Sequence, residues 1–194
     1  MLELSDRLII GTGGQRICYA HPDERDLCIK IPFETKLAQA MQRAEIDYLK
    51  TPAAKTCEHL AQYHGSVETT EGLGYLYDLV RDGSGDVSPP ITHFLKKSPD
   101  RSSEICEELG EVYRSMRSLR LRVHDLNGSN ILCQTGLDGS IALKLIDGIG
   151  DPSFLAPLKS FGPLHGISLR RRFERLVRRV ERKIGQPGLG LTFR

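Results

Sequence analysis

Short apolar stretches separated by polar turns predict three β-strands in the first third of the chain. The stretches are residues 8–10, 17–20 and 27–31. Three glycines within residues 11–14 separate the first two stretches and favour a hairpin. Residues 21–26 are a polar turn, and Pro32 stops the third strand. The chain therefore begins as a small sheet.

Helical spacing follows the third strand. Residues 35–50 place Leu37, Met41, Ala44 and Leu49 on related faces of a helix. Residues 63–67 and 73–80 then predict two more strands around a Glu-Gly turn, and residues 81–90, rich in Asp, Gly, Ser and Pro, predict a linker.

The back half of the chain is mainly helical. Residues 102–120 carry one apolar face, with Ser102 and Ser103 as the predicted cap. The apolar face consists of Ile105, Leu109, Val112, Met116 and Leu119. A loop at 123–130, strands at 130–134 and 141–146, and a last helix follow. In that helix Leu169, Phe173, Leu176, Val177, Val180 and Ile184 share one face, opposite a row of arginines.

This order predicts an α+β protein with two lobes: a small antiparallel N-lobe sheet and a reduced helical C-lobe. We expect one domain over residues 1–194, with the N-lobe at 1–80, the hinge or linker at 81–90, and the C-lobe at 91–194.

Composition limits the function classes. No apolar run approaches the roughly 20 residues that span a membrane, and the N-terminal residues do not resemble a secretory signal. The five cysteines are scattered and odd in number, without a C-x-x-C pair or metal-ligand spacing. We therefore expect free thiols, a cytoplasmic location and no zinc site.

Charge is distributed unevenly. Residues 167–185 hold eight Arg or Lys against two Glu, a charge of +6 in a chain whose net charge is +2. A docked surface helix with a solvated basic face is the simpler interpretation. Contact with an anionic surface, such as lipid headgroups or phosphorylated glycans, is the alternative. The arginines lack interleaved aromatic residues, which argues against nucleic acid.

Two features of the N-terminal sheet are candidates for binding phosphate. Gly11, Gly13 and Gly14 form a turn that either closes a hairpin or brings backbone N–H groups close to phosphate oxygens. Lys30 is the only cation in its strand and either faces solvent or points into a cleft, where Glu45 is the best candidate partner.

The strongest candidate chemistry lies in the back half. Asp125 is followed five positions later by Asn130. Asp147 directly follows the predicted strand at 141–146. Each could be a turn residue. Their order and apolar frame instead favour a set that holds Mg²⁺ and accepts a proton from a hydroxyl, as phosphoryl transfer requires.

These stretches resemble protein kinases. Leu27-Cys28-Ile29-Lys30 resembles the V-A-I-K strand, residues 124–130 resemble the catalytic loop, and Ile146-Asp147-Gly148 resembles the D-F-G motif. The Asp-Leu-x-x-x-Asn-Ile-Leu pattern is closer to the bacterial members of this superfamily. The whole chain is similar to the YrbL family, named as part of the PhoP regulatory network.

The resemblance implies roles for the matching residues. Asp125 would accept the hydroxyl proton, Asn130 and Asp147 would bind Mg²⁺, and Lys30, oriented by Glu45, would hold the phosphates of ATP. The three glycines would cover these phosphates. Asp78 and Val80, in the segment before the linker, would offer backbone groups to adenine.

Departures from the kinase pattern bear on the acceptor. Val123 and His124 replace the His-Arg of H-R-D, Gly148 replaces the phenylalanine of D-F-G, and no A-P-E motif follows. The short segment 151–163 favours a small molecule or glycan over a peptide as acceptor. The sequence therefore predicts an ATP- and Mg²⁺-dependent phosphotransferase, with an inactive nucleotide-binding or scaffold protein as the alternative.

Overall fold

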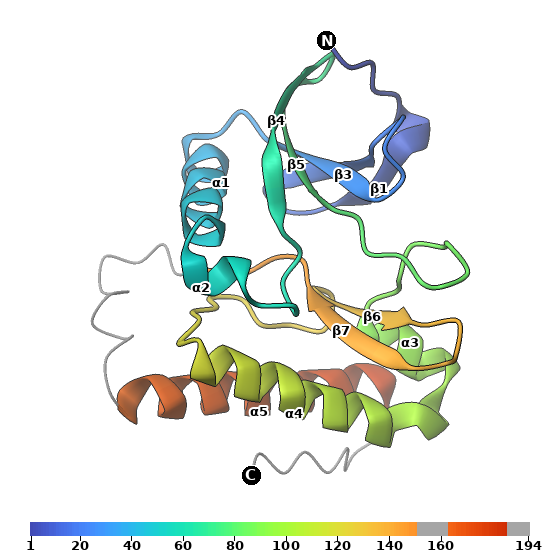
Figure 1. Cartoon of the computed structure of the whole chain (residues 1–194), viewed down its shortest axis with the longest axis vertical. Coiled ribbons are helices and arrows are strands. Elements are labelled where there is room, and N and C mark those ends of the chain that lie inside the picture. Colours follow the sequence, from blue (N-terminus) through green and yellow to red (C-terminus); the bar gives the residue numbers. More distant parts are fainter. Residues whose placement is uncertain (151–162, 186–194) are drawn as a thin grey trace.

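The computed structural model describes residues 1–150 and 163–185, with side chains from 165 in the second range. The molecule has two halves along its long axis (Figure 1). The upper half holds a sheet and a helix, and the lower half is mainly helical. The upper elements are η1 (Asp6–Leu8), β1 (Ile9–Thr12), β2 (Arg16–Ala20), β3 (Leu27–Pro32), α1 (Lys36–Leu49), α2 (Pro52–Lys55), β4 (Tyr63–Thr69) and β5 (Gly72–Asp78).

The N-terminal sheet is antiparallel, with strand order β1-β2-β3-β5-β4. β3 is the central strand, and its side chains alternate between two buried surroundings. Ile29 packs with Leu4 and Tyr19, whereas Cys28 belongs to the main core of the molecule. Lys30 shares the face of Cys28 and is only 4% exposed. The strand prediction is confirmed, and Lys30 does not face solvent.

Helix α1 buries a face that is partly polar. Thr35 caps its start by accepting a hydrogen bond from the Ala38 N–H. The buried residues are Ala38, Gln42, Glu45, Ile46 and Leu49, while Leu37 is 60% exposed. Of the four apolar residues predicted to lie on related faces, only Leu49 is buried, because two polar side chains, Gln42 and Glu45, turn inward and bond to Arg16.

The lower half contains α3 (Ile91–Lys97), η2 (Pro99–Arg101), α4 (Ser102–Ser118), β6 (Ile131–Thr135), β7 (Ile141–Leu145) and α5 (Pro163–Ile184). Helices α4 and α5 lie side by side at the base (Figure 1), with the Tyr113 and Phe173 rings edge to face at 5.4 Å. Both predicted apolar faces are buried there, except that Leu119 and Ile184 are only partly covered. The predicted serine cap of α4 is wrong, because η2 runs directly into the helix and its N-cap is Arg101.

The predicted linker is a tight loop bonded to both halves of the molecule. The Arg81 side chain donates to the carbonyl of Arg25, in the turn between β2 and β3 of the upper half, at 2.8 Å. Asp82 accepts hydrogen bonds from the Ser88 hydroxyl and from the N–H of Thr135 in β6. These bonds join the β5–α3 connection to each half. Among the described helices, none is both long and apolar enough to cross a membrane.

This architecture confirms the predicted α+β fold with a small antiparallel sheet and a reduced helical half.

Candidate functional site

The loop of residues 123–130, here called the Asp125 loop, is organised by side-chain amides. Asn127 Nδ2 donates to Asp125 Oδ2 at 2.8 Å, and Asn130 Nδ2 lies 3.3 Å from the same oxygen. Asn127 Oδ1 in turn accepts from the Ser129 N–H at 2.9 Å, a local bond typical of asparagine in turns. Leu126 is buried and anchors the loop to the core. The exposed Asp125 carboxylate is thus fixed in direction.

Asp147 approaches this loop through Gly148. Gly148 has φ +76°, a conformation that L side chains rarely adopt, and its carbonyl accepts a hydrogen bond from the His124 N–H at 2.8 Å. A Cβ at Gly148 would lie 2.2 Å from the carbonyl oxygen of Asp125. Only glycine therefore allows the two segments to lie this close, which explains why no side chain follows Asp147.

Lys30 and Glu45 meet as predicted. Lys30 Nζ lies 3.7 Å from Glu45 Oε1 and donates to the carbonyl of Ile146 at 2.6 Å. It also lies 4.1 Å from the centre of the Tyr77 ring. The lysine and the glutamate are each 4% exposed. The upper sheet thus sends a buried ammonium group to the residue that precedes Asp147.

Arg16 joins this cluster although the sequence did not point to it. Its guanidinium contacts Gln42 Oε1 at 2.8 Å, Glu45 Oε2 at 2.7 Å and Asp147 Oδ1 at 2.5 Å. Arg16 stands where a nucleotide-binding glycine turn would have its third glycine. Strand pairing offers the missed signal, because Cys18 pairs with Lys30 and residue 16 shares its face.

The cations change the ionisation of their neighbours. Burial opposes the charge of Asp147, but the positive charges of Arg16 and Lys30 outweigh it and lower the pKa of this carboxyl. Burial also opposes the charge of Arg16, yet Glu45 holds the pKa of the guanidinium above its usual value. The cluster therefore contains two cations, Lys30 and Arg16, against two carboxylates.

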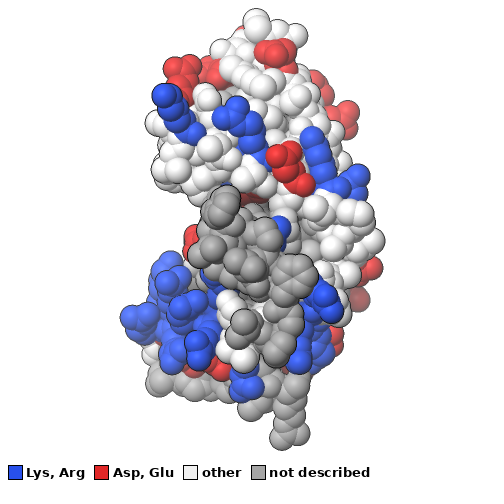
Figure 2. Space-filling model, turned by 90° about the vertical axis from the view of Figure 1, so that its left-hand side faces the viewer, with Lys and Arg blue, Asp and Glu red and all other residues white. Residues whose placement is uncertain are grey.

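A cavity of about 360 Å³ opens beside the cluster, between the glycine turn, α1 and the Asp125 loop. Figure 2 shows a hollow between the two halves of the molecule. The structure brings six predicted site residues to the cavity lining: Gly13, Gly14, Glu45, Asp125, Asn130 and Asp147. Arg16, Gln42, His124 and Asn127 also line it and were not predicted as site residues.

Four predicted residues lie outside this lining. Gly11 is in β1 opposite Cys18, and Lys30 is buried behind Glu45. The Asp78 carboxylate accepts from the Gln62 N–H at 2.7 Å and lies 2.5 Å from His64 Nε2. The carbonyl of Val80 accepts from the Ser88 N–H at 3.0 Å. The role of these residues in nucleotide binding stays a prediction.

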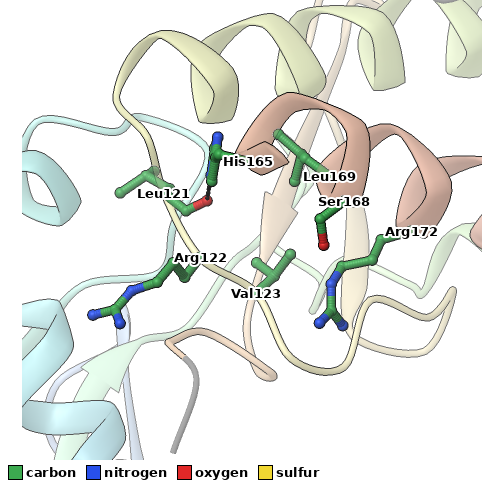
Figure 3. Close-up of a pocket in the computed structure, with 7 residues that line it drawn as sticks. All are labelled: Leu121, Arg122, Val123, His165, Ser168, Leu169 and Arg172. Carbon is green, nitrogen blue, oxygen red and sulfur yellow. Dashed lines mark hydrogen bonds between the residues drawn. The ribbon is translucent and has the colours of Figure 1, made fainter. Parts of the chain in front are cut away.

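Helix α5 holds the backbone that leads into the Asp125 loop (Figure 3). His165 Nε2 lies 2.9 Å from the Leu121 carbonyl oxygen, and Arg172 donates to the carbonyl of His124 at 2.8 Å. A small cavity of about 20 Å³ lies between these two contacts. The basic helix thus has a structural role that its charge pattern alone did not reveal.

The arrangement of sheet, helix α1, Asp125 loop and helical base defines a kinase-like fold. A crystal structure of a kinase domain superposes on this chain with a TM-score of 0.50 and 17% sequence identity. The match covers 72% of this chain and 48% of the other, so this chain spans about half the length of that structure. The similarity shows the fold.

The family is defined by sequence. The family model described as PhoP regulatory network protein YrbL matches residues 2–181, so the chain belongs to the YrbL family. The uncharacterised protein YrbL of Escherichia coli (strain K12) is 30% identical over 197 residues, which cover 99% of this chain and 90% of the relative. The Shigella flexneri protein of the same name matches equally. The predicted family resemblance is confirmed.

Proposed function

We propose that this protein is an ATP- and Mg²⁺-dependent phosphotransferase that moves the γ-phosphoryl group to a hydroxyl of a small molecule or glycan. One observation carries the proposal: Asp125, Asn130 and Asp147 line a single cavity together with the glycine turn and Glu45. Positioning and charge neutralisation are what this chemistry demands of a protein.

The donor set fits Mg²⁺. Asn130 contacts Asp125 through its amide nitrogen, so the Oδ1 of Asn130 is not used in that contact. Asp147 supplies a carboxylate to the same cavity. Within the described residues no group of three or more His, Cys, Asp or Glu forms a metal site. A complete protein cage is not required, because Mg²⁺ usually takes one or two carboxylates and completes its shell with phosphate and water. Bound there, it would neutralise charge on the transferring phosphoryl group.

The glycine turn fits phosphate. None of Gly11, Gly13 and Gly14 has a positive φ, and a Cβ at any of them would meet no described atom closer than 3.7 Å. Neither strain nor packing within the described chain therefore calls for glycine here. An uncrowded turn beside two cations supports the interpretation that these positions leave room for an outside group.

The chain's own residues then have distinct roles. Asp125 would take the proton of the acceptor hydroxyl while the hydroxyl oxygen forms a bond to the γ-phosphorus. The bond from that phosphorus to the bridging oxygen would break, and ADP would leave with its electron pair. Lys30 and Arg16 would hold the phosphates, with Glu45 orienting both cations.

Labelled phosphoryl transfer tests this proposal. The wild-type protein and the variants Asp125→Asn and Asp147→Asn would be incubated with Mg²⁺, γ-labelled ATP and cell extract, and the products separated into protein, glycan and small-molecule fractions. We expect each variant to lose transfer by about 10²- to 10⁴-fold. Asp138→Asn is the matched control, because Asp138 is exposed on the β6–β7 turn. Undiminished transfer by both site variants would refute the proposal.

A non-catalytic nucleotide-binding protein is the second candidate. The contact between Arg16 and Asp147 favours it, because this guanidinium occupies the oxygen that a metal would use. Such a protein would bind ATP with equal affinity with and without Mg²⁺ and would form no phosphorylated product. Titration calorimetry with ATP in EDTA and in Mg²⁺, alongside the transfer assay, separates the two. The prediction that segment 151–163 offers a reduced platform, or none, for peptide substrates concerns residues that, up to 162, lie outside the described part of the chain.

A further inference from the structure

A second cavity, of about 300 Å³, lies between α3, the Asp125 loop and the end of α5. Thr92, Asn127 and Gly128 form one side. Arg179, Arg182 and Lys183 form the other. Its size is that of a small-ligand site, and none of its lining residues is aromatic. Apart from Asn127, its lining residues differ from those of the cavity of the proposed transfer site.

The positive charge of this cavity comes from three exposed side chains. Arg179, Arg182 and Lys183 are exposed, and among the described residues none of them forms an ion pair. The ion pair of α5 that the structure contains, between Arg170 and Glu174, lies more than one helical turn away. Three positive side chains around one hollow create a potential that attracts anions.

The cavity adjoins the transfer site through Asn127. This residue lines both cavities, and its Nδ2 lies 2.8 Å from Asp125 Oδ2. The next residue brings the loop close to the helices, since a Cβ at Gly128 would lie 2.7 Å from Thr92 Cγ2 and 3.0 Å from Val180 Cγ2. A ligand in the basic cavity therefore lies one side chain away from the proposed proton acceptor.

We propose that this basic cavity binds an anionic group, phosphate or carboxylate, of a small hydroxylated acceptor whose hydroxyl reaches Asp125. This inference rests on the proposed phosphotransferase function. A single anionic group satisfies the three cations at once, because phosphate and carboxylate oxygens accept several charge-assisted hydrogen bonds. A hollow lined by three cations and no aromatic side chain suits such a group better than a nucleobase.

The test is titration calorimetry on the full chain without ATP. Three pairs of probes differ in one anionic group: glycerol with glycerol 3-phosphate, glucose with glucose 6-phosphate, and glucose with glucuronate. We expect an anionic probe to bind at least about tenfold more tightly than its neutral partner, because hydrogen bonds to a charged group are stronger than those to a neutral one. The phosphate and carboxylate pairs distinguish the two kinds of anion.

Variants locate the binding. The double variant Arg182→Gln/Lys183→Gln should weaken binding of the anionic probe at least about tenfold. The control Arg171→Gln/Arg175→Gln removes the same charge from exposed α5 residues outside the cavity and should keep the affinity. Thermal melting verifies that both variants are folded. Equal losses in both variants, or no preference for any anionic probe, overturn the inference.

Two further results separate this inference from the proposed function. Anion binding without any labelled product would leave the cavity assigned and defeat the phosphotransferase proposal. Phosphoryl transfer to an acceptor while no anionic probe binds would do the reverse. Anionic vesicles or DNA that bind through Arg182 and Lys183, in place of the small probes, would also overturn the inference.

Discussion

Replacing Gly148 by alanine tests whether the close approach of Asp147 to the Asp125 loop organises the site. An alanine Cβ would lie 2.2 Å from the Asp125 carbonyl oxygen, whereas real Cβ contacts are essentially never under 3.0 Å. The two segments must therefore separate by about 0.8 Å, or the backbone at residue 148 must leave its present conformation. Either change moves Asp125 relative to Asp147.

Two costs combine in this variant. A non-glycine residue in the left-handed region costs about 1–2 kcal/mol, and a core overlap of this kind costs about 1–3 kcal/mol more. Gly148→Ala should thus lower the free energy of unfolding by about 2–5 kcal/mol, a large share of the 5–15 kcal/mol that is typical of a domain. A displacement near 1 Å should also reduce phosphoryl transfer about 100-fold.

Gly139→Ala isolates the first of these costs. Gly139 has φ +81°, and no described atom beyond its chain neighbours lies within 4 Å of a Cβ placed there. Urea unfolding of both variants gives the difference directly, because the slope and midpoint yield each free energy of unfolding. We expect Gly148→Ala to be about 1–3 kcal/mol less stable than Gly139→Ala. Equal stabilities, with transfer retained in Gly148→Ala, would refute the argued contact.

Three further predictions follow from individual contacts. Arg16→Gln should weaken binding of Mg²⁺–ATP about tenfold by calorimetry. The same variant should raise the pKa of Asp147, which Arg16 lowers in the folded protein. Because this pKa is lowered by folding, ionised Asp147 stabilises the fold above the ordinary carboxyl pKa, and this stabilisation is lost as the pH falls. The melting temperature of the variant should therefore depend less on pH below about 4 than that of the wild type. Arg172→Gln should cost about 1.5–3 kcal/mol of stability, measured by urea unfolding, because it breaks the bond to the loop backbone. Burial raises the pKa of Cys28 and Cys133 to about 12, so a thiol reagent at pH 8 should label them only upon unfolding, and fast labelling of the native protein would contradict their burial.

The fold could be predicted from the sequence where the signal is local. Strands, turns and the two apolar helix faces at the base depend on side-chain periodicity over a few residues. The buried face of α1 could not, since Leu37 is exposed while the polar Gln42 is buried. A hydrophobic pattern assigns polar residues to solvent, and this assignment fails where a polar helix face lines a site.

The site divides in the same way. Lys30 and Glu45 could be paired in advance because a lone lysine in an apolar strand is unusual and its resemblance to a kinase strand is specific. Arg16 gave no such signal. Its partners Glu45 and Asp147 are 29 and 131 positions away, and only the folded chain brings them together. The basic cavity depends likewise on the loop at Gly128 meeting the end of α5.

The two halves of the molecule meet at the site through charge. Arg16 of the upper sheet donates to Asp147, and Lys30 donates to the carbonyl of Ile146, so the two cations contact two adjacent residues below. Glu45 balances these cations from α1. Such buried ion sets seldom add stability, because desolvation offsets their attraction. A cation that binds Asp147 must displace Arg16, and a displaced Arg16 needs a new anion. Metal and phosphate would satisfy both demands together, which ties the binding of one to the binding of the other.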